Sequence, residues 1–195
     1  MSATELCATV GRHTAEWVQF FSKQKQSVQN VAAHWEPPPV NWIKINVDGA
    51  FHANTGCGGW GCIARGHNSE AIFAGAGSIV DAGAALETEA KALFEAVKIT
   101  EDLGIGWPLF VTDCQVLQSA VTTSAYDYAQ LGALFREIKV RLRLNFAQAR
   151  VVFEGRNCNR VAHGAAELPG YNSVWLEDFP TNVTRALSGD SAGDR

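Results

Sequence analysis

The sequence has few charged residues, no long apolar run and no secretory signal pattern, and each of these absences argues against a class of protein. Only 18% of its 195 residues are charged and the formal net charge is −4, which disfavours binding to nucleic acid by the whole surface, because Lys and Arg supply most phosphate affinity. No run of eighteen apolar residues occurs, so no membrane span is expected. Residues 1–17 lack the basic start, apolar stretch and cleavage site of a secretory signal. We therefore expect an intracellular protein, with nucleus and cytoplasm both open.

Several chemical motifs are also missing. The five cysteines are odd in number, widely separated and never arranged as CxxC, which argues against a disulfide framework or a zinc ribbon and favours reduced thiols. No GxSxG occurs, so a serine hydrolase has no nucleophile motif. Residues 56–61 fit GxGxxG, but no helix is expected directly after them, and a dinucleotide site needs that helix to hold the pyrophosphate. We interpret these glycines as turn residues.

The sequence does contain enough apolar material for a single core. Hydrophobic residues make up 47% of the chain, and a chain of this length typically forms one domain. The prolines at 37–39 favour extended backbone, so we expect an N-terminal arm over residues 1–40. The domain is expected over residues 41–168, followed by a C-terminal tail over residues 169–195.

Hydrophobic periodicity predicts an α/β fold within this domain. Alternation with period two, and short apolar runs between glycine-rich turns, predict strands over 42–48, 59–65, 70–79, 109–112 and 147–153. Helical spacing predicts helices over 84–103, 115–121, 128–144 and 157–167. The first three strands are expected to be antiparallel. A crossover through the first helix is expected to be parallel and right-handed, and one arrangement that it allows has the first and fourth strands as parallel neighbours.

Three acidic residues are expected to meet at one edge of this sheet. Asp48 and Asp113 each end a predicted strand, and the carboxyl ends of parallel strands lie at the same edge. On the first helix, Glu89 lies among the apolar residues that face the sheet, where a carboxylate is costly without a partner. Such a set suits a hard ion, Mg²⁺ or Mn²⁺, and two ions permit attack of water on a phosphodiester. The alternative is that both aspartates only start turns.

Short segments between residues 42 and 168 form a more specific pattern. They read KINVDGA at 44–50, GWG at 59–61, TEAKAL at 88–93, VTD at 111–113 and VAH at 161–163. Arg156 and Asn159 come shortly before the last segment, and WEPP at 35–38 comes just before the first. The acidic residues and His163 follow one another at intervals of 41, 24 and 50 residues. This pattern resembles the ribonuclease H family, in its reverse-transcriptase-like form found in plant retroelements. The resemblance implies a ribonuclease H-like fold, a five-stranded mixed sheet with helices on both faces.

The resemblance also implies an activity and a set of site residues. The implied enzyme is a divalent-metal-dependent endonuclease that cuts the RNA strand of an RNA–DNA hybrid and leaves 5′-phosphate and 3′-hydroxyl ends. Asp48 would hold both of two Mg²⁺ ions, with Mn²⁺ as the other candidate, while Glu89 and Asp113 complete the site around one of them. The backbone near Gly49 is expected to contact the 2′-hydroxyl. The implied partners are an RNA–DNA hybrid and a reverse transcriptase or other retroelement protein. The substrate-binding residues implied are Gly49, Asn159 and Arg156.

Two departures from the family pattern keep a second function open. His163 stands where the family usually has a fourth acid, and a neutral imidazole is a poor Mg²⁺ ligand, so the second ion is expected to bind less well or to be Mn²⁺. Alternatively, His163 passes a proton to the leaving oxygen, or has no role. The basic insertion that grips hybrids is missing, although residues 127–163 carry seven basic and three acidic residues, which form either a weak phosphate-facing patch or a solvated helix face. The alternative function is a catalytically degenerate nucleic-acid-binding or interaction domain.

Overall fold

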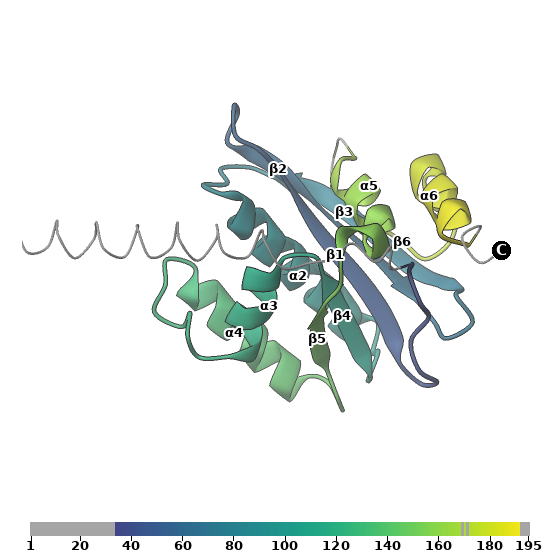
Figure 1. The fold of residues 1–195 in the computed structure, drawn as a ribbon, viewed down its shortest axis with the longest axis horizontal. Helices are drawn as coiled ribbons and strands as arrows, with labels where there is room; N and C mark the ends of the chain where they lie inside the picture. Colours follow the sequence, from purple (N-terminus) through teal and green to yellow (C-terminus); the bar gives the residue numbers. More distant parts are fainter. Residues whose placement is uncertain (1–33, 169, 171, 192–195) are drawn as a thin grey trace, which may run out of the picture. The chain divides into compact units, whose positions relative to one another are not determined.

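The computed structural model describes residues 34–168, 170 and 172–191, so most of the predicted N-terminal arm lies outside the described residues. Within the described part of the chain, no helix is long and apolar enough to span a membrane. Helices and strands follow one another as Figure 1 shows. In chain order they are β1 (Ile43–His52), β2 (Cys57–Arg65), β3 (Ala71–Ile79), α2 (Ala85–Asp102), β4 (Pro108–Thr112), α3 (Gln115–Thr122), α4 (Gly132–Leu144), β5 (Arg150–Phe153), η1 (Arg156–Cys158), α5 (Arg160–Ala166), β6 (Ser173–Trp175) and α6 (Thr181–Ser191).

The strands form one mixed sheet in the order β5-β4-β1-β2-β3-β6. The first three strands pair antiparallel, as predicted. β1 pairs in parallel with β4, and β4 pairs in parallel with β5. The predicted crossover is therefore confirmed: α2 leaves the meander after β3 and returns the chain to the opposite side of β1 (Figure 1).

The sheet has six strands, which corrects the expected number of five. The added strand, β6, pairs antiparallel with β3 and lies in the segment expected as a C-terminal tail. Just before it, the Asn172 side chain accepts a hydrogen bond from the Trp60 indole at 3.3 Å. α6 follows, and its Val183 is buried in the core. A strand of three residues shows no measurable periodicity, so its existence depends on these contacts with distant residues.

Two apolar cores cover the two faces of the sheet. The larger core joins Ile45 and Val47 of β1 to the buried side of α2, including Leu93 and Val97, and to residues of α3 and α4. The smaller core joins Ile63 of β2 to α5 and α6 on the other face. Successive side chains of a strand point to opposite faces of the sheet. One face of β1 is covered by α2 and the other by α5.

Glycines in β2 allow α5 to lie directly against the sheet. A Cβ atom on Gly61 would lie 2.3 Å from the backbone nitrogen of Ala166, and one on Gly59 would lie 2.1 Å from its carbonyl oxygen. No side chain fits in this space, because a Cβ contact under about 3 Å requires the backbone to shift. The close approach lets α5 lie against β1 and β2. The single helix expected over 157–167 is in fact divided into η1 and α5.

Candidate active site

β1 and β4 carry the two predicted aspartates to the same edge of the sheet. The last parallel pair joins Asn46 to Val111. Asp48 lies two residues further along β1, and Asp113 directly follows β4. The sequence places Asp48 at the end of its strand, but β1 continues to His52 beside β2 alone. The edge is therefore open where β4 ends, which is the usual place for a ligand in an α/β sheet.

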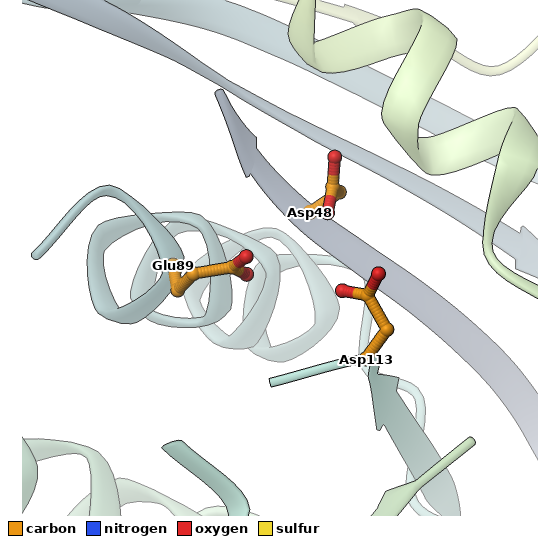
Figure 2. A group of neighbouring side chains, drawn as sticks. All are labelled: Asp48, Glu89 and Asp113. Atoms are coloured by element: carbon orange, nitrogen blue, oxygen red, sulfur yellow. The ribbon is translucent and has the colours of Figure 1, made fainter. Parts of the chain in front are cut away.

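Glu89 reaches this edge from the first turns of α2. The helix lies against β1 at Gly49, where a Cβ atom would be 2.3 Å from the carbonyl carbon of Thr88 and 2.4 Å from the nitrogen of Glu89. The carboxylates of Asp48, Glu89 and Asp113 point toward one another from β1, α2 and the end of β4 (Figure 2). One oxygen of each lies within 4.8 Å of the others. The structure thus brings the three acids together as the sequence predicts.

These carboxylates are too close and too buried to be stable as three bare charges. Burial, and then the charges of Asp48 and Asp113, raise the pKa of Glu89 to about 9, although a hydrogen bond from the Gly49 backbone partly opposes this. Burial also raises the pKa of Asp48 above its ordinary value. The Oε2 atom of Glu89 is buried without a hydrogen-bond partner among the described residues. A divalent cation fits this site, since it would satisfy the orphaned oxygen and offset the repulsion.

Two basic side chains contact the aspartates from the segment that contains η1 and α5. The Nδ1 atom of His163 lies 2.7 Å from Oδ2 of Asp48, and its Nε2 atom lies 3.6 Å from Glu167. Arg156 donates a hydrogen bond from Nε to Oδ2 of Asp113 at 3.2 Å. The His163 side chain is 48% exposed and that of Arg156 is 82% exposed, whereas the side chains of Asp48 and Asp113 are 7% and 8% exposed. Both basic groups therefore form the solvent-facing rim of the site.

The other residues expected to bind substrate have internal contacts. Asn159 is buried, and its amide donates to the carbonyl oxygen of Val47 at 2.8 Å and accepts from the amide of Asn46 at 3.2 Å. Gly49 pairs with Trp60 in the ladder between β1 and β2. The side chain of Asn159 is thus used within the protein. A substrate contact at Gly49, Asn159 or Arg156 stays a prediction.

Sequence reasoning missed a buried polar cluster next to the acids. Lys44 and Asn46 of β1 and Arg65 of β2 are all buried, and the Trp35 ring lies over Arg65 at 3.5 Å. The available signal was the alternation of Lys44, Asn46 and Asp48, which places three polar side chains on one face of a strand. That face is covered, so the polar residues need partners there.

The predicted basic patch borders a groove between α4 and the loop after α3. The groove has a volume of about 420 Å³, and Arg136, Lys139 and Arg143 are among the residues that line it. Lys139 pairs with the carboxylate of Asp127, which offsets part of its charge, and Arg136 donates to the backbone carbonyl oxygen of Asp127. Arg141 pairs instead with Glu101 and Glu137. The patch is therefore less positive than the count of basic residues predicts.

Comparisons with known proteins support one kind of fold. The sequence model of a family described as reverse transcriptase-like matches residues 46–168, while no curated protein sequence matches the chain. The solved structures that resemble it include RNase H1 of the halophilic archaeon Halobacterium salinarum, with a TM-score of 0.56 at 23% identity, covering 64% of this chain and 94% of that one. LC11-RNase H1, isolated from compost by a metagenomic approach, gives a TM-score of 0.59 at 18% identity, covering 66% and 97%.

LC11-RNase H1 has also been solved in complex with an RNA/DNA hybrid, and that structure matches with a TM-score of 0.56 at 17% identity, covering 63% of this chain and 92% of that one. The N-terminal RNase H domain of a Mycobacterium tuberculosis protein gives a TM-score of 0.54 at 14% identity, covering 79% and 99%. At identities this low the likeness establishes a shared fold.

Proposed function

The chain belongs to the reverse transcriptase-like family and has a ribonuclease H-like fold, and on this premise we propose that it is a divalent-metal-dependent endonuclease. It hydrolyses the RNA strand of RNA–DNA hybrids and leaves 5′-phosphate and 3′-hydroxyl ends. The observation that carries the proposal is the meeting of Asp48, Glu89 and Asp113 within 4.8 Å at the edge where β4 ends. The complex of LC11-RNase H1 with an RNA/DNA hybrid supports the choice of substrate.

Asp48, Glu89 and Asp113 would hold the divalent ion or ions, with Mg²⁺ as the first candidate and Mn²⁺ as the second. Oxygen ligands of this kind suit both metals. When bound, the ions lower the pKa of water and stabilise negative charge on the phosphate, and two of them can act together on one phosphodiester. The buried Oε2 of Glu89, which has no hydrogen-bond partner in the part of the chain that the structure describes, supports this assignment. Asp48 is the residue that would contact both ions.

His163 is proposed to move a proton at the rim of the site. Its Nδ1 atom faces the carboxylate of Asp48 at 2.7 Å, which favours a proton on Nδ1. Its other nitrogen is then an acceptor that can take a proton released by the attacking water and pass it to the leaving oxygen of the substrate. The exposure of the ring, 48%, leaves room for this exchange. The competing proposal is that His163 is a weak ligand to the second ion.

Recognition of the hybrid is proposed to involve Arg156 and the backbone near Gly49. Arg156 is highly exposed and already oriented toward Asp113, so it can turn to a phosphate when ions neutralise that carboxylate. The 2′-hydroxyl distinguishes the RNA strand from DNA. The net charge of −4 gives little general attraction to phosphates, so we propose that a tethered partner, a reverse transcriptase or another retroelement protein, supplies part of the affinity.

Cleavage of a labelled RNA–DNA hybrid tests the proposal. The wild-type protein should cut the hybrid in Mg²⁺ or Mn²⁺, and chelation should stop it. Asp48→Asn should lower the rate by at least about a hundredfold, because it removes a charge that stabilises the ions and the transition state. Asp102→Asn, an exposed acid at the end of α2, is the matched control and should cut normally. If the folded wild-type protein binds the hybrid but neither metal supports cleavage, the chain is instead a catalytically degenerate nucleic-acid-binding domain.

A further inference from the structure

Trp35, outside the sheet and before β1, contacts the buried polar cluster on the α5 side of the sheet. Its indole nitrogen donates to the Asn46 side-chain oxygen at 3.0 Å. Its ring lies over the Arg65 guanidinium at 3.5 Å and within 5.4 Å of the Lys44 ammonium. The neighbouring Glu36 accepts a hydrogen bond from Lys44 through its carbonyl oxygen at 3.0 Å. This segment therefore closes the cluster from the outside.

Asn46 is the centre of this cluster, and its amide group is fully hydrogen-bonded. The oxygen accepts from Trp35 and, at 3.4 Å, from Arg65. The nitrogen donates to the carbonyl oxygen of Cys158 at 3.0 Å and to Asn159 at 3.2 Å. A side-chain amide has two donors and two acceptor sites, so all of them are used. Asn46 is completely buried, and the loss of any one partner is costly at such a site.

The partners of Asn46 continue directly into the proposed active site. Asn159 donates from its side chain to the carbonyl oxygen of Val47, next to Asp48. Its own carbonyl oxygen accepts from the backbone nitrogen of His163 at 3.0 Å, in the first turn of α5. His163 then contacts Asp48 at 2.7 Å. Successive hydrogen bonds thus connect Trp35, through Asn46 and Asn159, to His163 and Asp48 at the proposed metal site.

A second contact ties the same two segments together. The thiol of Cys158, the last residue of η1, donates to the carbonyl oxygen of His34 at 3.3 Å. η1 also contains Arg156, which contacts Asp113. The residues on either side of Trp35 are therefore joined both to β1 and to the segment that carries Arg156 and His163.

We propose that Trp35 is a positioning residue of the active site, which fixes η1 and α5 against β1 through Asn46 and so holds His163 at Asp48. This inference rests on the proposed function, since it assigns a task in hydrolysis to a residue that touches neither substrate nor ions. A purely structural role would weaken the whole fold, whereas a positioning role predicts that loss of Trp35 loosens the α5 segment more than α2 and slows the chemical step. Partners that orient the groups around a metal site typically change activity by about 10–100-fold.

Two variants of the full chain separate the two contacts of Trp35. Trp35→Ala removes both the hydrogen bond to Asn46 and the ring over Arg65, whereas Trp35→Phe keeps a ring and removes only the hydrogen bond. Trp107→Phe is the matched control, because Trp107 packs edge-to-face on Trp42 and is not among the four hydrogen-bond partners of the Asn46 side chain. Amide hydrogen exchange followed by NMR compares the His163 amide with that of Leu93 inside α2. Hybrid cleavage gives kcat and KM for the same proteins.

In Trp35→Ala the His163 amide should exchange about tenfold faster than in the wild type while Leu93 is unchanged, and kcat should fall about tenfold with KM within about twofold. Trp35→Phe should lie between, and the control should match the wild type. Equal loss of protection at His163 and Leu93, or a Trp35→Ala protein that matches the control in both measurements, overturns the proposal. If the wild type cuts no hybrid, the proposed function fails, and the exchange comparison alone decides whether Trp35 fixes α5.

Discussion

Replacing Glu89 by Gln should stabilise the metal-free protein, although it removes a residue of the proposed site. The carboxylate is buried beside Asp48 and Asp113, and its pKa is raised from 4.5 to about 9. Gln has the same shape, keeps an oxygen for the Gly49 amide, and places an N–H donor beside the two aspartates. The substitution therefore removes an electrostatic penalty without opening a cavity.

The magnitude follows from the dependence of stability on pH. A carboxyl group whose pKa is raised on folding carries no penalty below pH 4.5, where it is protonated in both states. Above that pH the Glu89 carboxyl group ionises in the unfolded chain but stays protonated in the folded protein. The free energy of unfolding therefore falls by about 1.4 kcal/mol for each pH unit until about pH 9. At pH 7, Glu89→Gln should thus be more stable than the wild type by up to about 3 kcal/mol. At pH 4 the two proteins should be equally stable.

Urea denaturation in a chelator at pH 4, 5.5 and 7 measures this difference directly. In a second series, Mn²⁺ should stabilise the wild type through binding to the folded state and should have little effect on Glu89→Gln. Glu95→Gln, a partly exposed acid on the same helix that pairs with Lys98 at 3.0 Å, is the control for the loss of one charge. A difference between wild type and Glu89→Gln that stays constant from pH 4 to pH 7 would refute the electrostatic reasoning.

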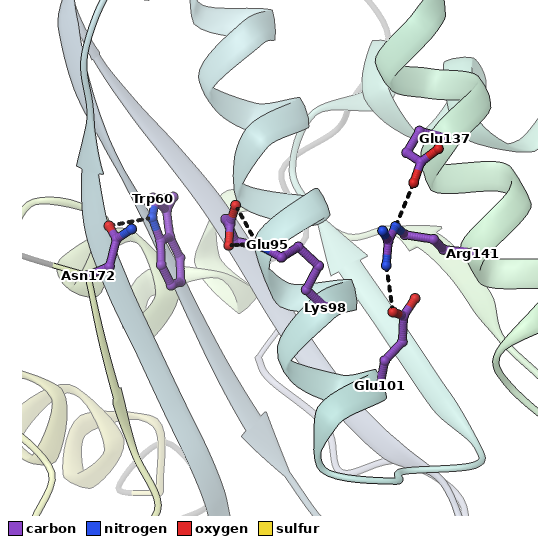
Figure 3. A network of polar contacts seen from close by, with 7 residues as sticks. All are labelled: Trp60, Glu95, Lys98, Glu101, Glu137, Arg141 and Asn172. Carbon is purple, nitrogen blue, oxygen red and sulfur yellow. Dashed lines mark hydrogen bonds and ion pairs between the residues drawn. The ribbon is translucent and has the colours of Figure 1, made fainter.

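Three further predictions concern other parts of the structure. His163→Asp separates the two proposals for this residue: a ligand role predicts a higher ratio of the cleavage rate in Mg²⁺ to that in Mn²⁺, because an imidazole is exchanged for a ligand that Mg²⁺ prefers, whereas the proton-moving role predicts slower cleavage in both metals with an unchanged ratio. Gly49→Ala should lower the free energy of unfolding by about 1–3 kcal/mol, because its Cβ atom would lie 2.3 Å from the α2 backbone. The shift of α2 should also abolish the stabilisation by Mn²⁺, and chemical denaturation with and without the ion measures both effects. Arg141 joins α4 to α2 through Glu101 at 2.7 Å and also pairs with Glu137 (Figure 3). Arg141→Gln should therefore cost about 1 kcal/mol in urea denaturation, since it leaves the mostly buried Glu101 without its cation, and a cost no larger than that of Glu137→Gln would argue against this coupling.

The acidic site could be predicted because each of its residues depends on a local pattern. Asp48 and Asp113 each follow a short alternating or apolar run of the sequence, and the crossover rule favours a parallel arrangement of the two strands that contain these runs. Glu89 follows from the period of a single amphipathic helix, whose buried face includes Leu93 and Val97 as expected. The fold class follows from the same elements, since the order of strands and helices leaves few topologies for the sheet.

What could not be predicted depends on contacts between distant residues. The alternation in β1 predicts one apolar face and says nothing of what covers the other, so the partners of Asn46 are invisible in the sequence. β6 is too short to show a pattern and lies beside β3, close to the bond from Trp60 to Asn172. The internal use of the Asn159 amide likewise depends on β1, more than a hundred residues away.

The central proposal is that the chain cuts the RNA strand of a hybrid by means of Asp48, Glu89 and Asp113, at the edge of the sheet where β4 ends. The most direct test labels the RNA strand and the DNA strand of one hybrid separately and identifies the ends of every product formed in Mn²⁺ or Mg²⁺. We expect cuts in the RNA strand alone, with 5′-phosphate and 3′-hydroxyl ends, and none with Asp113→Asn. Cuts in the DNA strand, products with 2′,3′-cyclic phosphate ends, or undiminished cleavage by Asp113→Asn would contradict it.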